Sequence, residues 1–270
     1  TVLGIVLSQS DRLVLGRLLP LEQLGYYTVA VTLAAAIGRT VGPVITAVFP
    51  RLTSTYAAED GVQMRETYSR SARIVDFVVA PVGVGLALFA YDVLHVCIWS
   101  AEVASRAHLS LSLLALGYML NSMSHLATTV QYAAGKVRLL LIYGIVSLVV
   151  FVPLLYLAVT RWGIAGAAGC WLVLNIVSYL VLPALTHRHI FRSSAHEIPA
   201  LAGLRFVLES LLLLGSARLL GEAIGATAVV NLLLAALATC LYVAIHYWRR
   251  RDEVHRALQS LWQARTARLT

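Results

Sequence analysis

The chain of 270 residues carries 21 Lys and Arg against 13 Asp and Glu, a formal net charge of +8, yet only 13% of its residues are charged and 59% are hydrophobic. Soluble domains carry about 25% charged residues, and a mean hydropathy of +0.80 is far too apolar for them. This composition excludes most water-soluble classes and indicates an integral membrane protein. The three cysteines lie in apolar stretches without CxxC spacing, so neither a disulfide framework nor a zinc site is expected.

Eight stretches are long and apolar enough for transmembrane helices, which need about 20 mostly apolar residues each. In chain order they are roughly 2–19, 26–50, 74–97, 108–133, 139–159, 163–185, 204–220 and 226–248. Pro and Gly residues mark the breaks between them, and no segment alternates polar with apolar residues as a barrel strand does. We therefore expect an all-α, polytopic transmembrane helical bundle over residues 1–248 and a basic tail over 249–270. Because Thr1 already lies in an apolar stretch with no basic segment before it, no signal peptide is expected.

Lysine and arginine are distributed unequally between the two sides of these helices. Fifteen follow the second, fourth and sixth helices or lie in the tail, whereas four lie on the opposite side. Because basic residues favour the cytoplasmic side, both ends of the chain are predicted to be cytoplasmic. Basic residues in short loops and a tail argue against nucleic-acid binding.

The tail repeats apolar residues at helical spacing, at Val254, Leu258 and Leu261, after three consecutive arginines. This pattern is typical of an amphipathic helix on an anionic membrane surface. A stop-transfer tail with no further role is the alternative.

Arg39 is the clearest charge inside an expected span, since it lies near the middle of the second helix. An arginine at the bilayer centre costs about 2.5–3.5 kcal/mol, so we expect it to face a partner or a hydrated cavity. Thr32, Ala36, Gly42 and Thr46 share its helical face at spacings of three and four residues. A small, polar face of this kind suits the wall of a cavity.

Two further charges, Asp11 and Arg12, lie inside the first expected helix. Asp11 and Arg39 differ in expected depth by about 9 Å, which two extended side chains or one water molecule could bridge. One reading is a structural ion pair that holds the first two helices together. The other is a cationic, partly hydrated cavity for an anionic substrate, with Arg12 contributing and Asp11 responding to an ion or a proton.

The fourth expected helix carries a polar stripe, because one face presents Tyr118, Asn121, His125, Thr128 and Tyr132. Hydrogen bonds between helices would explain such a stripe, and so would a substrate cavity lined by Asn121, His125 and Tyr132. A lone histidine is more often a packing residue than a ligand. The sequence shows no nucleotide motif, catalytic triad or metal cluster, so we expect no enzyme, no cofactor and no metal.

Five short passages, in order, resemble the C-terminal half of polysaccharide and lipopolysaccharide (O-antigen) flippases. They are Gln9–Leu19, Leu24–Ala30, Val48–Leu52, Ala133–Lys136 and Trp162–Ala168. These flippases belong to the multidrug/oligosaccharidyl-lipid/polysaccharide exporter superfamily. The remaining 100 residues or so resemble the family only in hydropathy.

The resemblance implies the C-terminal lobe of a two-lobe transporter in the bacterial inner membrane, with a missing N-terminal lobe as its first partner. Its substrate would be an undecaprenyl-pyrophosphate-linked oligosaccharide, moved across the membrane by alternating access among membrane lipids, with a polysaccharide polymerase as a candidate partner. Arg39 would then face the pyrophosphate or an acidic sugar. Two alternatives stay open: a multidrug or cation antiporter of the same superfamily, and a non-transporting scaffold of a polysaccharide-assembly complex.

Overall fold

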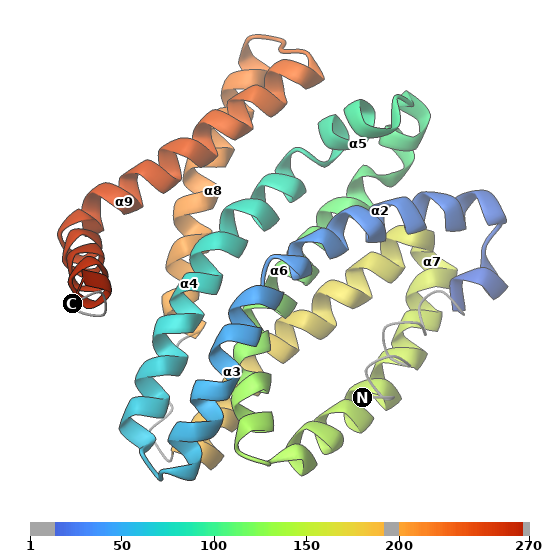
Figure 1. The fold of residues 1–270 in the computed structure, drawn as a ribbon. Coiled ribbons are helices and arrows are strands. Elements are labelled where there is room, and N and C mark those ends of the chain that lie inside the picture. Colours follow the sequence, from blue (N-terminus) through green and yellow to red (C-terminus); the bar gives the residue numbers. More distant parts are fainter. Residues whose placement is uncertain (1–13, 192–199, 267–270) are drawn as a thin grey trace.

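The computed structural model describes residues 14–191 and 200–266, with side chains placed for 14–191 and 203–249. These residues form eight α-helices and one π-helical turn (Figure 1). The helices are α2 (Leu21–Arg39), α3 (Gly42–Ala57), α4 (Gly61–Leu88), α5 (Ala90–Ile98), α6 (Ala101–Ala133), α7 (Val137–Thr186), α8 (Ala200–Ala223) and α9 (Ala228–Thr266), and the π turn η1 is His187–Phe191. The expected all-α fold is confirmed.

Several helices extend beyond the apolar stretches that predicted them. The helix expected from residue 74 begins at Gly61 as α4, because the side chain of Asp60 accepts a hydrogen bond from the amide of Gln63 at 2.9 Å. In α6 the cap is Ser100, whose hydroxyl accepts from the amide of Val103 at 3.3 Å. Likewise α9 continues through the expected tail to Thr266. The helix expected over 2–19 lies mostly outside the described residues, of which 14–18 are helical.

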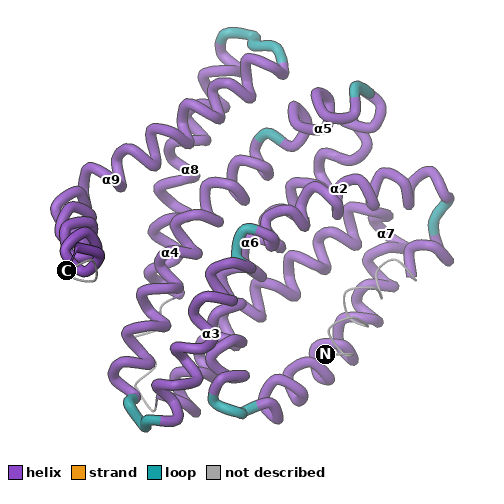
Figure 2. The backbone as a smooth tube through the Cα atoms, in the orientation of Figure 1, coloured by secondary structure: helices purple, strands orange, loops and turns teal. Residues whose placement is uncertain are grey.

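The stretch expected to form one helix over 26–50 is divided into α2 and α3. Pro43 has no N–H group, and its ring would clash with the carbonyl of Arg39, four residues earlier. The amides of Thr40 and Val41 turn back instead to the carbonyls of Ile37 and Gly38, at 3.2 and 3.3 Å. Figure 2 shows this break and the one between α4 and α5 as short loops inside long helical stretches, whereas other turns lie at the ends of helices.

A sharp turn at Gly163 folds α7 into two halves that run antiparallel. Gly163 has φ 57° and ψ −137°, a conformation that side chains with a Cβ rarely adopt. Beyond the turn, Gly166 packs on the backbone of Ala158, and the thiol of Cys170 donates to the carbonyl of Leu154 at 3.6 Å. The two halves therefore occupy the places of the two helices expected over 139–159 and 163–185.

Helix α6 is the centre of the bundle and packs against α2, α4, α5 and α7, while α8 packs on α4 and α9 on α8. The chain passes between two ends of the bundle (Figure 1). One end carries the α3–α4 and α6–α7 turns and η1, and we call it the basic end because it includes Arg51, Lys136 and Arg188. The other end carries the α5–α6 and α8–α9 turns. Large apolar side chains such as Val149, Leu212 and Leu233 are exposed along the helices, and five described stretches are long and apolar enough to cross a membrane.

Candidate functional site

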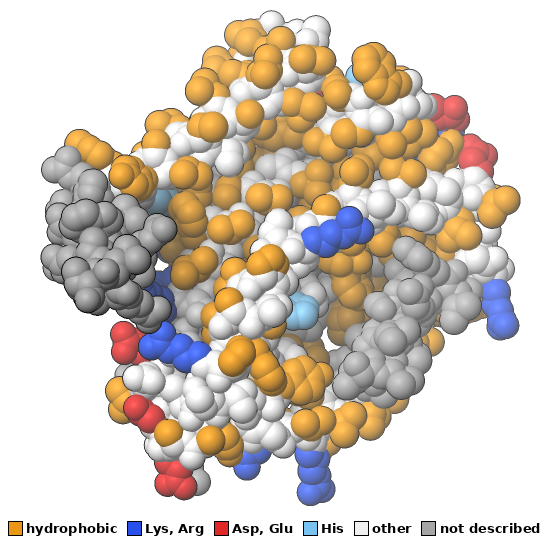
Figure 3. Space-filling model, viewed as in Figure 1, with side chains coloured by type: hydrophobic (Ala, Val, Ile, Leu, Met, Phe, Trp, Pro, Cys, Tyr) orange, Lys and Arg blue, Asp and Glu red, His pale blue; other side chains and the backbone are white. Residues whose placement is uncertain are grey.

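Arg39 lies in the middle of a membrane-length stretch and is exposed. It is eighteen residues from each end of the stretch Leu21–Ala57, and the other members of its expected face, Thr32, Ala36, Gly42 and Thr46, are exposed with it. Figure 3 shows basic and histidine side chains set in the largely apolar face that carries α2 and α3. Among the described residues, no acidic side chain forms an ion pair with Arg39.

The break between α2 and α3 adds its own polar groups to this face. Arg39 is the last residue of α2, where a cation complements the negative end of the helix dipole. Gly42 and Pro43 begin α3, and the first amides of a helix have no partner within that helix. A guanidinium beside a helix N-terminus favours an anionic ligand. Broken helices of this kind occur in membranes only where the backbone is buried in protein or lines a water-filled cavity.

His125 lies at the level of this break. A Cβ on Gly38 would be 4.0 Å from the hydroxyl of Ser122, so α2 and α6 are in close contact there. One turn along α6, His125 is exposed. Arg39 and His125 thus lie at similar depth on the outside of the described helices.

Asn121 and Tyr132 are placed differently from the rest of the predicted site. The amide of Asn121 donates to the side-chain oxygen of the buried Asn175 at 2.9 Å, which ties α6 to α7. Asn121 and Tyr132 line a cavity of about 230 Å³ between α6 and the two halves of α7. Thr128 and Asn175 line the same cavity. The residues that line this cavity do not include Arg39 or His125, so the structure divides the predicted site into an open face and an interhelical pocket. Asp11 and Arg12 lie outside the described residues.

A buried charge network that was not predicted from the sequence lies towards the end of the bundle opposite the basic end. Asp92 in α5 exposes 3% of its surface. Its carboxylate accepts from Nη1 of Arg218 in α8 at 2.6 Å and from Nδ2 of Asn231 in α9 at 2.9 Å. Since these partners are 126 and 139 residues away along the chain, no local spacing could predict the contact. The network fastens the α8–α9 hairpin to α5.

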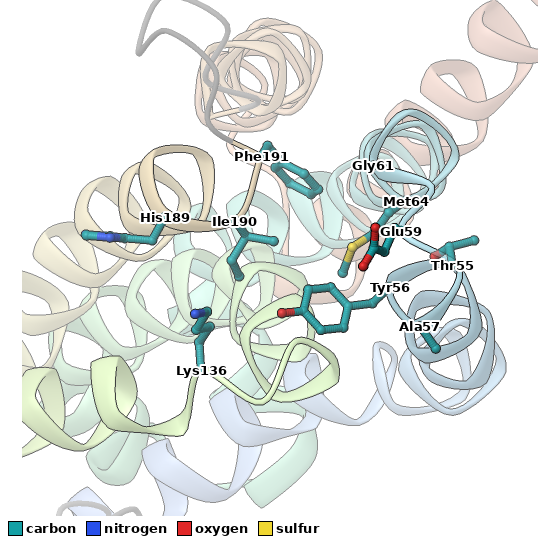
Figure 4. A pocket seen from close by; sticks show the side chains of 10 residues that line it. All are labelled: Thr55, Tyr56, Ala57, Glu59, Gly61, Met64, Lys136, His189, Ile190 and Phe191. Carbon is teal, nitrogen blue, oxygen red and sulfur yellow. The ribbon is translucent and has the colours of Figure 1, made fainter.

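At the basic end an open pocket of about 600 Å³ lies between the α3–α4 turn, the α6–α7 turn and η1. In Figure 4 the ring of Tyr56 points across the pocket towards Lys136, while His189 points away from it. Glu59 and Met64 line the far side. With one lysine and one glutamate on its walls, this pocket has no clear charge preference, so it is a weaker candidate for an anionic ligand than the face of Arg39.

Comparison with known proteins agrees with the family expected from the sequence motifs. Residues 1–101 match the family described as "Polysaccharide biosynthesis protein". The chain is 23% identical over 188 residues to a protein of Shigella flexneri named "Putative O-antigen transporter", a match that covers 69% of the chain. The matched region is only 44% of that relative's length. No solved structure matches the chain.

The matching region includes the passages 9–19, 24–30 and 48–52 on which the resemblance was first based, as well as Arg39. The helical fold, the membrane-length stretches and the family match agree with one another. The chain is a multi-pass membrane protein, and its first 101 residues are similar to the polysaccharide biosynthesis protein family.

Proposed function

We propose that this chain forms one lobe of a transporter that carries a lipid-linked oligosaccharide across the bacterial inner membrane, with Arg39 contacting the anionic pyrophosphate or an acidic sugar. The observation that carries the proposal is an exposed arginine at the midpoint of a membrane-length stretch, without an acidic partner among the described residues. Leaving such a charge against lipid is costly, so its face is best explained by a hydrated cavity shared with another lobe. The distant likeness to an O-antigen transporter supports this class of substrate.

In this proposal the face of α2 and α3 forms one wall of the cavity, and the wall opposite belongs to a part of the transporter that precedes the chain. His125 lies at the depth of Arg39 and contributes to the same wall, and Arg12, which lies outside the described residues, is proposed as a second cation. The pocket of Asn121 and Tyr132 is a secondary candidate subsite. The basic end faces the cytoplasm, because Lys and Arg gather on the cytoplasmic side of membrane proteins.

The test is Arg39→Ala in the full-length natural protein, with surface polysaccharide as the readout. We expect polysaccharide export to fall about 10- to 100-fold, because a hydrogen bond to a charged group contributes roughly 1.5–3 kcal/mol. Arg39→Lys should retain part of the activity, since lysine keeps the charge but not the bidentate geometry. Arg106→Ala is the matched control, because Arg106 is an exposed arginine outside this face.

Wild-type polysaccharide from a well-expressed Arg39→Ala protein would contradict the proposal. The same strains separate the two alternatives. An antiporter for cationic drugs predicts that drug tolerance changes while polysaccharide does not. A scaffold predicts that Arg39→Ala is silent and that deletion of the tail from Arg249 abolishes recruitment of partner proteins.

A further inference from the structure

A second buried carboxylate, Asp76, lies in the interior of α4 and is not part of the proposed cavity. Asp76 is the sixteenth of the 28 residues of α4 and exposes 4% of its surface. Within the described parts of the chain no Lys, Arg or His forms an ion pair with it, and none of the side-chain hydrogen bonds found there reaches its carboxylate. It is therefore a buried acid without a compensating cation.

The start of α8 is shaped to fit against this acid. A Cβ placed on Gly203 would lie 2.9 Å from Oδ2 of Asp76 and 2.6 Å from the hydroxyl of Tyr179 in α7. Real Cβ atoms do not approach other atoms so closely, so a larger residue at this position would require the side chains of Asp76 and Tyr179 to move. The carboxyl group of Asp76 and the hydroxyl of Tyr179 thus lie together beneath the backbone of α8.

Among the side chains that the structure describes, no basic group is paired with Asp76. Helix α6, which packs against α4, contributes the buried, apolar Met123, Leu126 and Ala127 to the core that also contains Val75 and Val79 of α4. On α8 and α9 the charged side chains of this region bond to one another around Glu209, with Arg205 at 3.0 Å, His246 at 2.7 Å and Arg249 at 3.2 Å. The titratable groups that interact electrostatically with Asp76 are Tyr68 of α4, Tyr179 of α7 and Tyr242 of α9. The charged or titratable residues described on α4 and on the elements around it include Arg73 of α4, Arg51 of α3, His187 of η1, Arg205 and Glu209 of α8, and His246 and Arg249 of α9.

An ionised carboxylate in this position would carry a charge that neither water nor a cation compensates, and a buried group so placed takes up a proton instead. A metal ion is a poorer fit, because hard cations require about six or more oxygen ligands and the described side chains offer one carboxylate and one nearby hydroxyl. The chemistry of the site therefore favours a proton as its ligand.

We propose that Asp76 is a proton-binding site of this protein, neutral while α8 is packed against α4, and that loss of the proton loosens the α4–α8 contact. The ionised form would need water, and water reaches the carboxylate only if the backbone at Gly203 moves away. The basic-end half of α8 then becomes a pH-sensitive element. This inference does not depend on the substrate of the transporter, and its test needs none.

The test is infrared spectroscopy of the full-length natural protein in lipid nanodiscs at neutral pH. A protonated carboxylic acid has a carbonyl stretch that an ionised carboxylate lacks. We expect this band in the wild type and its loss in Asp76→Asn. Asp92→Asn is the matched control: Asp92 is as buried as Asp76 but is paired with Arg218, so its removal should leave the band unchanged.

Two further measurements keep the test decisive. Asp76→Glu retains an acid and should shift the frequency of the band without removing it. This variant keeps the test informative if the Asp76→Asn protein does not fold. Raising the pH of the wild type should abolish the band and speed hydrogen exchange of the α8 amides near Gly203, whereas the end of α8 near Arg218 should stay protected. A band that is identical in the wild type, Asp76→Asn and Asp76→Glu, or α8 exchange that does not respond to pH, would overturn the proposal.

Discussion

Asp76 and Asp92 can be compared directly, because their side chains are almost equally buried. Only Asp92 is paired with a cation among the described residues. Asp76 exposes 4% of its surface and Asp92 exposes 3%. Asp92 is bonded to an arginine and an asparagine, whereas Asp76 meets a glycine backbone and a tyrosine hydroxyl. Helix α8 supplies the key neighbour in both places, since Gly203 is near its start and Arg218 near its end.

Helix α8 is therefore attached to the bundle in two physically distinct ways. Towards the turn that joins it to α9, Arg218 fastens it to the buried Asp92 of α5, and removing Arg218 would leave Asp92 without its cation. At the basic end, close packing holds it against α4 only while the acid beneath it is neutral. We therefore expect the two ends to respond differently to mutation and to pH.

The largest effect should come from Arg218→Met. This change leaves Asp92 buried without its cation, and breaking a buried ion pair typically costs about 3–5 kcal/mol of unfolding free energy. Equilibrium unfolding in detergent measures the loss. The control is Arg205→Met, whose ion pair with Glu209 has a 65% exposed arginine and should cost less than about 1 kcal/mol. Equal losses in the two variants would break the comparison.

A smaller effect is expected from Gly203→Ala. The new methyl group would collide with the carboxyl of Asp76 and the hydroxyl of Tyr179, and overpacking of this kind costs about 1–3 kcal/mol. Gly215→Ala on the same helix is a matched control, because a Cβ there would meet nothing within 4 Å. Since alanine is the better helix former by about 1 kcal/mol, Gly215→Ala should be neutral or stabilising in the same unfolding measurement. Similar destabilisation by both changes would show that Gly203 is not a special contact.

The smallest effect should come from Asp76→Asn, which has nearly the same shape and no charge. If Asp76 is neutral in the packed state, the unfolding free energy at neutral pH should change by less than the roughly 1–3 kcal/mol that an unsatisfied buried group costs. The corresponding Asp92→Asn should cost about 1–3 kcal/mol, because it removes the charge-assisted hydrogen bond from Arg218 and leaves Arg218 paired only with the more exposed Glu222. A loss at Asp76 as large as that at Asp92 would mean that Asp76 is ionised and paired.

The sequence explains why these two acids were not recognised beforehand. Apolar length alone placed the start of their span at residue 74, which put Asp76 at the membrane surface, where a charged side chain reaches water cheaply. The actual helix begins at Gly61, because Asp60 caps it and polar residues continue it, so Asp76 lies in its interior. Hydropathy reports where a helix is apolar, whereas capping decides where it begins.

The open face of Arg39 was more predictable from the sequence. Its position in an apolar run determined its depth, and the spacing of Thr32, Ala36 and Gly42 determined the face that they share. All four are exposed in the structure. The helix break beside Arg39 follows from Pro43, although its position within a continuous apolar stretch became clear only in the structure.

The class of this protein follows from its sequence alone. The length of the apolar stretches predicts membrane helices, and the absence of strand-like alternation predicts an all-α bundle. Short motifs predict the family that the chain resembles. Those properties are local, since each depends on residues within one helix or one turn. The tertiary structure decided which side chains share a site. It placed Asn121 against Asn175, Asp92 against Arg218, and Gly203 over Asp76. Such contacts join helices that are distant along the chain, and only their packing brings the groups within hydrogen-bonding or van der Waals distance.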